Sequence, residues 1–367
     1  MLAVGLFAYQ ATGSAFLVAM LGMLRILPMG LFGAVLGVVA ERVEQRSALL
    51  AIVLASMATS VVLGVLAVAG VLAVWHLAVA SFVNGAAWAA DNPVRRMMIG
   101  QVVGAPRMGA AMSADVGSNN ATRMLGPALS GLIFAAVGVE GAFFVSAALY
   151  LVALRAALAL RARSGRATAG GQGVLARIGE GLAVVRAHPG LQGALAVTVV
   201  FNVFAWPFTS LVPVVGQDHL GLGPEAIGLL ASMDGVGALA GAVLFALWAR
   251  PAHYARCYLG GVALYLAAIG VFGLSSRPVL SGAALLLAGF GQAGFAIMQA
   301  TLVYQLSPPE ARARVLGLLS VCIGIGPVGF LHLGLLADAV GAAPACAITA
   351  AEGLLALALT RRLWRRI

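Results

Sequence analysis

Residues 48–68 have the sequence ALLAIVLASMATSVVLGVLAV, a run without a single charged side chain. A helix rises about 1.5 Å per residue, so a segment of this length crosses a hydrocarbon layer about 30 Å thick. Similar apolar segments lie at residues 14–40, 71–91, 112–136, 140–160, 191–215, 226–248, 256–274, 279–303, 314–336 and 341–360. Because unpaired backbone groups are too costly in lipid, each segment is predicted to be a transmembrane helix. The chain is therefore expected to be an all-α membrane protein with eleven full spans.

The composition supports lipid as the main solvent of the folded chain. Hydrophobic residues make up 62% of the 367 residues and charged residues 9%, whereas roughly a quarter of a soluble domain is charged. All 22 basic residues are arginine. Without lysine the chain has no GxxxxGK[ST] phosphate loop and no Schiff-base chemistry, which excludes an ATP-driven pump with its own nucleotide site. We expect no metal, no cofactor and, despite the net charge of +10, no nucleic-acid partner.

The first nine residues, MLAVGLFAY, are apolar but too few to cross a bilayer. They look like the last half of a helix, and we expect that the start of the first transmembrane helix is missing. Either a start codon assigned too far downstream or a real truncation explains this pattern.

The arginines predict the orientation of the chain. Eighteen of them lie in alternate connections between spans and in the C-terminal tail, whereas the opposite connections hold only Arg277. By the positive-inside rule, the arginine-rich set faces the cytoplasm. With the truncated helix counted, the chain has twelve helices and a cytoplasmic C-terminus. We expect a monomer in the plasma (inner) membrane of a bacterium.

Residues 161–189 separate two predicted helix bundles, residues 1–160 and 190–367. The linker begins with RARSGRATAGGQG, whose small and polar residues are typical of a flexible segment. Its second part has apolar residues at helical spacing from Val174 to Val185, which predicts an amphipathic helix at the cytoplasmic membrane face. Two Gly-Pro pairs lie at matching places in the two bundles and predict helix bends there. They are Gly126 with Pro127, and Gly326 with Pro327.

The loop GVVAERVEQR at residues 37–46 resembles the GxxxDRxxRR signature of the major facilitator superfamily. Glu41 replaces the usual aspartate of the signature, and Gln45 replaces a basic residue. The resemblance implies two six-helix halves and a cytoplasmic gate that locks the outward-facing state. The residues expected to form this gate are Gly37, Glu41, Arg42, Arg46, Asp91 and Arg95.

Shorter matches resemble the drug and siderophore exporter branch of that superfamily, in particular its enterobactin-exporter-like group. They are YQATGSA at 9–15, NPVRR at 92–96, RMLGP at 123–127, HPGL at 188–191 and PEARAR at 309–314. This resemblance implies a secondary transporter that exports a small amphipathic molecule, a drug-like compound or a siderophore, by alternating access coupled to protons. The RxxQG motif of many proton-driven exporters is absent, because Ser81 and Asn84 precede Gly85 where the motif would stand.

Ionisable residues within spans are costly and therefore predict functional sites. Asp115, Asn119 and Arg123 recur every four residues and share one helix face. They could pair with one another through the amide, bind a polar substrate, or only pack helices together. Arg25 needs a partner on another helix, for which Asp115 and Asp234 are candidates. Asp234 is the only acid deep within a span of the second half, and we expect it to be a protonation site.

The remaining polar residues within spans predict a largely apolar cavity with a few polar groups. Its expected lining includes Asn202, Trp206, Gln292 and Gln299. Two alternatives to a transporter remain at this point. One is a membrane-embedded enzyme, for which the sequence offers no catalytic cluster, and the other is a membrane protein made transport-inactive by the truncated first helix.

Overall fold

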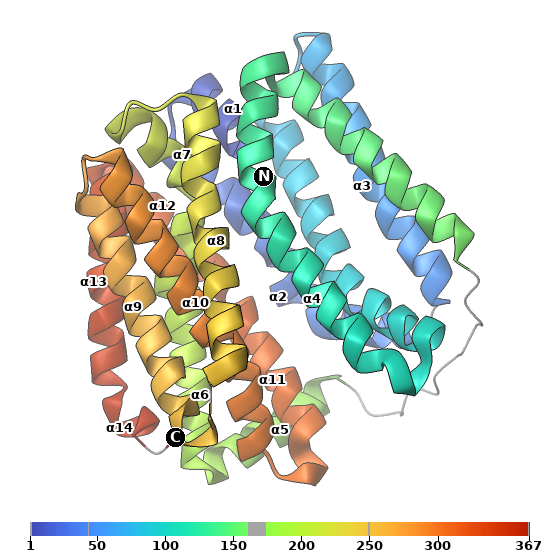
Figure 1. Cartoon of the computed structure of the whole chain (residues 1–367), viewed down its shortest axis with the longest axis vertical. Helices are drawn as coiled ribbons and strands as arrows, with labels where there is room; N and C mark the ends of the chain where they lie inside the picture. The colour runs from blue at the N-terminus through green and yellow to red at the C-terminus, as the bar shows by residue number, and fades with distance from the viewer. Residues whose placement is uncertain (1, 43, 161–173, 249, 366) are drawn as a thin grey trace.

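The computed structural model describes residues 2–42, 44–160, 174–248, 250–365 and 367, and over these ranges it contains helices and no strand (Figure 1). The longer helices are α1 (Leu2–Thr12), α2 (Ala15–Arg42), α3 (Gln45–Val68), α4 (Val74–Ala159), α5 (Val174–Ala187), α6 (Pro189–Val200), α8 (Pro224–Trp248), α9 (Tyr254–Leu274), α10 (Pro278–Leu306), α11 (Arg312–Gly324), α12 (Gly326–Val340) and α13 (Ala342–Leu359). The short elements are η1 (Phe201–Ala205), η2 (Trp206–Ser210), α7 (Val212–Val214), η3 (Val215–His219), η4 (Pro251–His253), η5 (Pro309–Ala311) and α14 (Arg361–Trp364).

The prediction of an all-α membrane protein is confirmed. Nine stretches of the described residues are long and apolar enough to cross a membrane, and they range from 18 to 46 residues in length. Large apolar side chains such as Trp248 and Leu355 point outward, 74% and 60% exposed, as expected for a surface that lipid covers. The count of eleven full spans stays a prediction, because three of them fall within the single helix α4.

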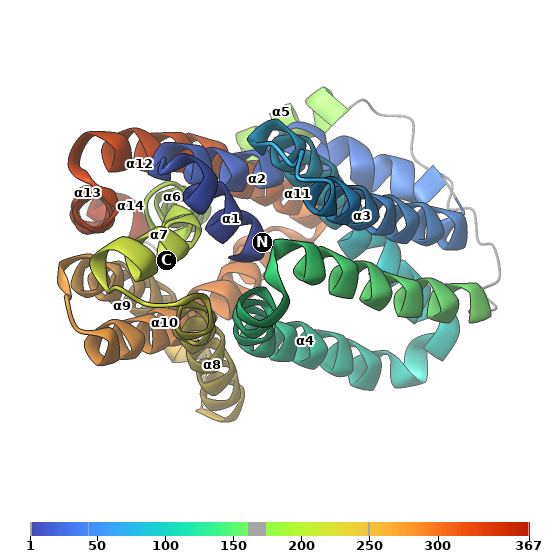
Figure 2. The same cartoon turned by 90° about the horizontal axis from the view of Figure 1, so that it is seen from above.

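Helix α4 has 86 residues and would be about 130 Å long if it were straight. It instead folds back on itself, so that its parts run side by side (Figures 1 and 2). At Gly138 the backbone φ is +69°, a conformation that glycine adopts without strain, and the chain reverses there between the predicted spans 112–136 and 140–160.

The two halves of the chain meet along two helix pairs, α2 with α12 and α4 with α8. Glycines allow close approach between α4 and α8, and also between α2 and the end of α11. A Cβ atom added to Gly228 of α8 would lie 2.6 Å from the carbonyl oxygen of Pro127 and 2.9 Å from Cα of Gly131 in α4. A Cβ atom on Gly30 of α2 would lie 2.4 Å from the carbonyl oxygen of Gly324 at the end of α11. Backbone therefore packs against backbone where the halves touch.

The matched Gly-Pro pairs behave differently in the two halves. In the second half α11 ends at Gly324 and α12 begins at Gly326, so Pro327 occupies the first turn of a new helix, where its missing N–H costs nothing. In the first half, α4 continues through Gly126 and Pro127. The helix break thus lies at Gly326 and Pro327, while a bend at Gly126 and Pro127 stays a prediction.

Helix α5 lies where the sequence predicts an amphipathic helix of the linker, whose place at the membrane face stays a prediction. Glu180 of this helix forms an ion pair with Arg314 of α11 at 3.0 Å, and Val185 is buried against Leu191 and Val315. The helix therefore docks on the second half, near α14 and the C-terminus (Figure 1). Residues 161–173 lie outside the described residues.

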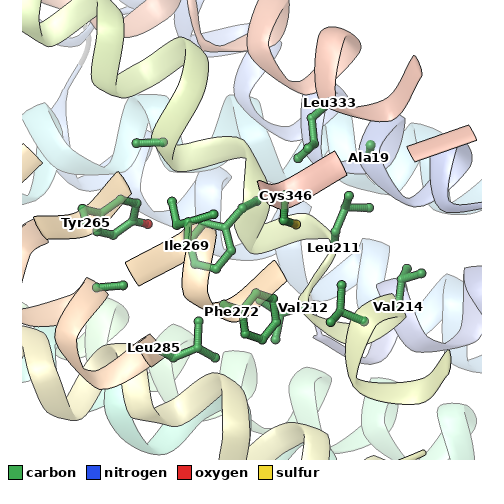
Figure 3. Packing of buried hydrophobic residues seen from close by; sticks show 14 of the residues in the cluster. Ala19, Leu211, Val212, Val214, Tyr265, Ile269, Phe272, Leu285, Leu333 and Cys346 are labelled. Atoms are coloured by element: carbon green, nitrogen blue, oxygen red, sulfur yellow. The ribbon is translucent and has the colours of Figure 1, made fainter. Parts of the chain in front are cut away.

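The largest buried apolar cluster lies mainly in the second half and extends into the first, for example to Leu6 and Leu77. Tyr265, Ile269 and Phe272 of α9 pack against Leu211 and Cys346 (Figure 3). Each of these side chains is fully buried. This core gives the helices of the second half a rigid support behind the residues that face the first half.

Candidate functional site

A cavity of about 770 Å³ lies between the two halves, and we call it the central cavity. Its walls come from α1, α2 and α4 on one side and from η2, α8, α10 and α12 on the other. The polar and aromatic side chains among its lining are Arg25, Trp88, Arg95, Asp115, Ser118, Asn119, Thr122, Arg123, Trp206, Phe208, Thr209, Ser210, Asp234, Gln292 and Phe330. The volume and the mixed lining are typical of a site for a drug-sized molecule.

An ion pair crosses this cavity from one half to the other. Nη2 of Arg123, in α4, lies 3.0 Å from Oδ2 of Asp234 in α8, and the same nitrogen donates a hydrogen bond to Oε1 of Gln292 in α10. The Asp234 side chain is 16% exposed, and its second oxygen, Oδ1, is buried without a hydrogen-bond partner among the described residues. Arg123 thus joins the halves through a carboxylate of which only one oxygen has a hydrogen-bond partner among the described residues.

A second ion-pair cluster lies within α4, toward the hairpin formed by its middle part. Arg95 Nε lies 2.9 Å from Oδ2 of Asp91, and Arg95 Nη1 pairs with Oδ1 of Asp115. Residues 91–95 and 115 belong to different arms of α4, so the cluster ties these arms together. Asp91 and Arg95 are therefore brought together, as the sequence led us to expect, while their role in a gate stays a prediction.

The prediction that Asp115 or Asp234 pairs with Arg25 was wrong. Asp115 pairs with Arg95 and Asp234 pairs with Arg123, so neither acid is left for Arg25. The Arg25 guanidinium instead lies over the ring of Trp88, 5.9 Å from its centroid. Of the alternatives for the face shared by Asp115 and Arg123, local pairing is not what the structure shows, because Asp115 pairs with Arg95 and Arg123 with Asp234.

Two of the residues expected to line the cavity are instead part of the second half's core. Asn202 is 2% exposed and donates a hydrogen bond to the Thr198 carbonyl at 2.8 Å. Gln299 is 8% exposed and donates to the Thr198 hydroxyl at 3.0 Å. The same hydroxyl lies 2.9 Å from that of Tyr258. Asn202 and Gln299 therefore both bond to Thr198 in a buried polar network. Trp206 and Gln292, in contrast, line the central cavity.

Three of the six predicted gate residues have no described surroundings. They are Gly37, Glu41 and Arg42, whose contacts lie outside the described part of the chain. Arg46 donates a hydrogen bond from Nη2 to the Leu158 carbonyl at 2.7 Å, which joins the start of α3 to the end of α4. This contact lies within the first half and does not cross between the halves.

A second cavity, of about 1420 Å³, lies inside the first half between α3 and the arms of α4. We call it the first-half cavity. Its lining is mainly apolar and includes Ala3 and Val4 at the beginning of α1. Five residues line both cavities and form the partition between the two spaces: Val4, Arg25, Trp88, Arg95 and Thr122.

Sequence analysis missed two contacts between the halves. Trp88 of α4 and Trp206 of η2 lie with ring centroids 6.5 Å apart, and the sequence indicated only Trp206 as a lining residue. Tyr9 of α1 donates a hydrogen bond to Asp218 of η3, 209 positions away in the chain. No local sequence pattern predicts that contact.

Comparison with known proteins places this architecture in a family. The model of the Major Facilitator Superfamily matches residues 1–331 and 194–366. Macrolide efflux protein A of Streptococcus pyogenes is 22% identical over 346 residues, covering 90% of this chain and 83% of that protein.

Solved transporters share the fold. The nucleoside transporter NupG superposes with a TM-score of 0.82 at 11% identity, covering 99% of this chain and 94% of that one. A bacterial homologue of the human lysosomal transporter Spinster superposes with a TM-score of 0.75 at 14% identity, covering 100% and 94%. These structural relatives are transporters and not enzymes. Together with the helical fold and the cavity between its halves, the match over nearly the whole chain shows that this multi-pass membrane protein belongs to the Major Facilitator Superfamily.

Proposed function

We propose that the protein is a secondary active transporter that exports a small amphipathic molecule by alternating access, and that protons drive the export. The observation that carries this proposal is the ion pair between Arg123 and Asp234. It joins the two halves across the central cavity, and it ends on a carboxylate whose second oxygen has no partner among the described residues.

The ion pair offers a physical route for coupling. A charged carboxylate with a buried, unpaired oxygen is costly, and a proton relieves that cost by making the group neutral. Protonation of Asp234 would also remove the ion pair, so that only the hydrogen bond to Gln292 would still join Arg123 to the second half. A contact between the halves would then be weakened whenever a proton binds, which links proton binding to the rocking of one half against the other.

We assign this structure to the inward-facing state, with twelve helices and a cytoplasmic C-terminus. The arginine distribution supports the orientation. In this orientation the packing of Gly131 against Gly228 and the bond from Tyr9 to Asp218 lie toward the outer face. The central cavity extends the other way, to Arg95 and Asp115. The gate formed by residues 37–46 would close that side in the opposite state.

The direction of transport and the substrate class rest on similarity and on the lining. The relative from Streptococcus pyogenes is named as a macrolide efflux protein. The central cavity combines Trp88, Trp206 and Phe330 with a few polar groups, which suits an amphipathic molecule.

The proposal is tested with the purified chain in proteoliposomes. Export is expected when a pH gradient is imposed, and it should fall sharply when the gradient is collapsed with a protonophore. A panel of amphipathic compounds that includes a macrolide serves as substrate. Transport at the same rate with and without the gradient would contradict proton coupling, and the absence of transport of every compound would contradict the proposed function.

A further inference from the structure

The charged side chains that line the central cavity are paired, with one exception. Arg123 pairs with Asp234, and Arg95 pairs with Asp115. Arg25 also lines the cavity, and it has no ion pair among the described residues. The wall of the central cavity therefore carries one arginine whose charge no neighbouring carboxylate balances.

Arg25 is held in place without being neutralised. Its guanidinium lies 5.9 Å from the centroid of the Trp88 ring, within the range of a cation–π contact. Gly85 packs so closely on α2 that an added Cβ atom would lie 2.1 Å from the Arg25 carbonyl oxygen. An arginine on a rigid backbone over an aromatic ring keeps its N–H groups free for a ligand, and its planar fork matches the two oxygens of a carboxylate.

Aromatic side chains lie beside this cation. The Trp88 ring is 6.5 Å from that of Trp206, which in turn is 6.4 Å from the ring of Phe330 in an edge-to-face arrangement. All three residues line the central cavity. Together they form an apolar wall that reaches from the first half to the second and suits the flat body of an aromatic ligand.

We infer that the substrate of the central cavity is an aromatic amphiphile with an anionic group, whose charge binds Arg25 and whose body packs against Trp88, Trp206 and Phe330. This inference rests on the proposed transport function and narrows it to one class of substrate. A single anionic group on the ligand would pair with Arg25 in place of a carboxylate from the protein. Such a pair is favourable because an unpaired cation is costly at a poorly solvated site.

The alternative reading is that Arg25 balances the acids at the hairpin of α4. Arg95 is shared by Asp91 and Asp115, which leaves negative charge at that end of the cavity. In that case Arg25 would serve the fold, and the cavity would not prefer anionic ligands.

Three dansyl probes of one scaffold distinguish these readings. Dansylglycine carries a carboxylate, dansylglycinamide is neutral and dansylcadaverine is a cation. Binding to the purified full chain is followed by dansyl fluorescence at equilibrium, without any pH gradient. The result therefore does not depend on whether transport is coupled to protons or directed outward. We expect the affinity for dansylglycine to exceed that for dansylglycinamide about ten-fold, as a hydrogen bond to a charged group gives, and dansylcadaverine to bind most weakly.

The variants assign the preference to its residues. Arg25→Gln should remove the difference between dansylglycine and dansylglycinamide, Arg25→Lys should retain part of it, and Trp88→Leu should weaken all three probes while keeping their order. Arg155→Gln, at an exposed arginine of α4, is the matched control and should leave every affinity unchanged. Equal affinity for the three probes, a preference for the cation, or no binding of any of them to the unmodified chain would each overturn the inference.

The same measurement separates the inference from the proposed function. If the anionic preference is present but proteoliposomes show no export, the assigned substrate class stands and the proposed function fails. If export occurs while the probes show no anionic preference, the proposed function stands and the role of Arg25 as a ligand-binding residue is refuted.

Discussion

Replacing Gly228 with alanine should open the contact between α4 and α8. The added Cβ atom would lie 2.6 Å from the Pro127 carbonyl oxygen and 2.9 Å from Cα of Gly131. Both neighbours are backbone atoms, which cannot rotate away, so the two helices must separate. Overpacking of this kind costs roughly 1–3 kcal/mol. In the proposed alternating access the halves part at this face in the opposite state, so the cost would fall on the present state alone.

The expected size of the effect follows from that cost. A change of about 1.4 kcal/mol is a factor of ten in a conformational equilibrium, so Gly228→Ala should increase the population of the opposite state between about five-fold and about a hundred-fold. A cysteine in place of Ser232 reports on this equilibrium, because Ser232 is 3% exposed and accepts a hydrogen bond from the Ala128 N–H across the same interface. Its rate of labelling by a membrane-impermeant maleimide, added from outside, should rise by the same factor.

Gly260→Ala is the matched control. No atom outside its own helix lies within 4 Å of a Cβ atom added there, so this variant should label at the unmodified rate. If Gly228→Ala also labels at the unmodified rate while the protein remains folded, the glycine contact does not hold the halves together at this end, and the assignment of the closed side is wrong.

Three further predictions follow from the fold and the topology. Tyr258→Phe should lower the free energy of unfolding by roughly 1–2 kcal/mol, because the lost hydroxyl leaves Thr198 with one partner fewer in a buried network. Thermal unfolding in detergent measures this change, and unchanged stability would contradict a structural role for the network. Arg42→Ala should lower transport while membrane abundance stays near normal, since a gate acts on cycling, and an equal loss of both would favour an ordinary structural loop. A cysteine replacing Arg163 should be labelled by an impermeant reagent only from the cytoplasm and one replacing Asp218 only from outside; the reverse pattern would overturn the orientation.

The sequence predicts the architecture well because a single physical constraint governs it. Lipid requires long apolar helices, and the runs without charge reveal them directly, as at residues 48–68. The amphipathic spacing from Val174 to Val185 likewise predicts α5 correctly. These features depend on neighbours within one turn or one span, so no knowledge of the tertiary structure is needed.

The partners within the cavity could not be predicted in the same way. Helical spacing places Asp115 and Arg123 on one face, but their partners are Arg95 and Asp234, which depend on how α4 folds back and on where α8 lies. Asn202 and Gln299 are polar residues within spans, as a cavity lining would be, yet Thr198 and Tyr258 satisfy them inside a core. A sequence alone does not tell a polar group that faces a cavity from one that is satisfied by another helix.

The most direct test of the account compares Asp234→Asn with the unmodified chain in proteoliposomes under an imposed pH gradient. The amide keeps the shape of the side chain but cannot be protonated at neutral pH, so we expect a folded variant that binds substrate and no longer responds to the gradient. Asp338→Asn, which makes the same change at an exposed position of α12, should respond as the unmodified chain does. Loss of the folded protein in Asp234→Asn would make the pair with Arg123 a structural one. Export by Asp234→Asn that responds fully to the gradient would contradict the central claim that Asp234 carries the coupling proton.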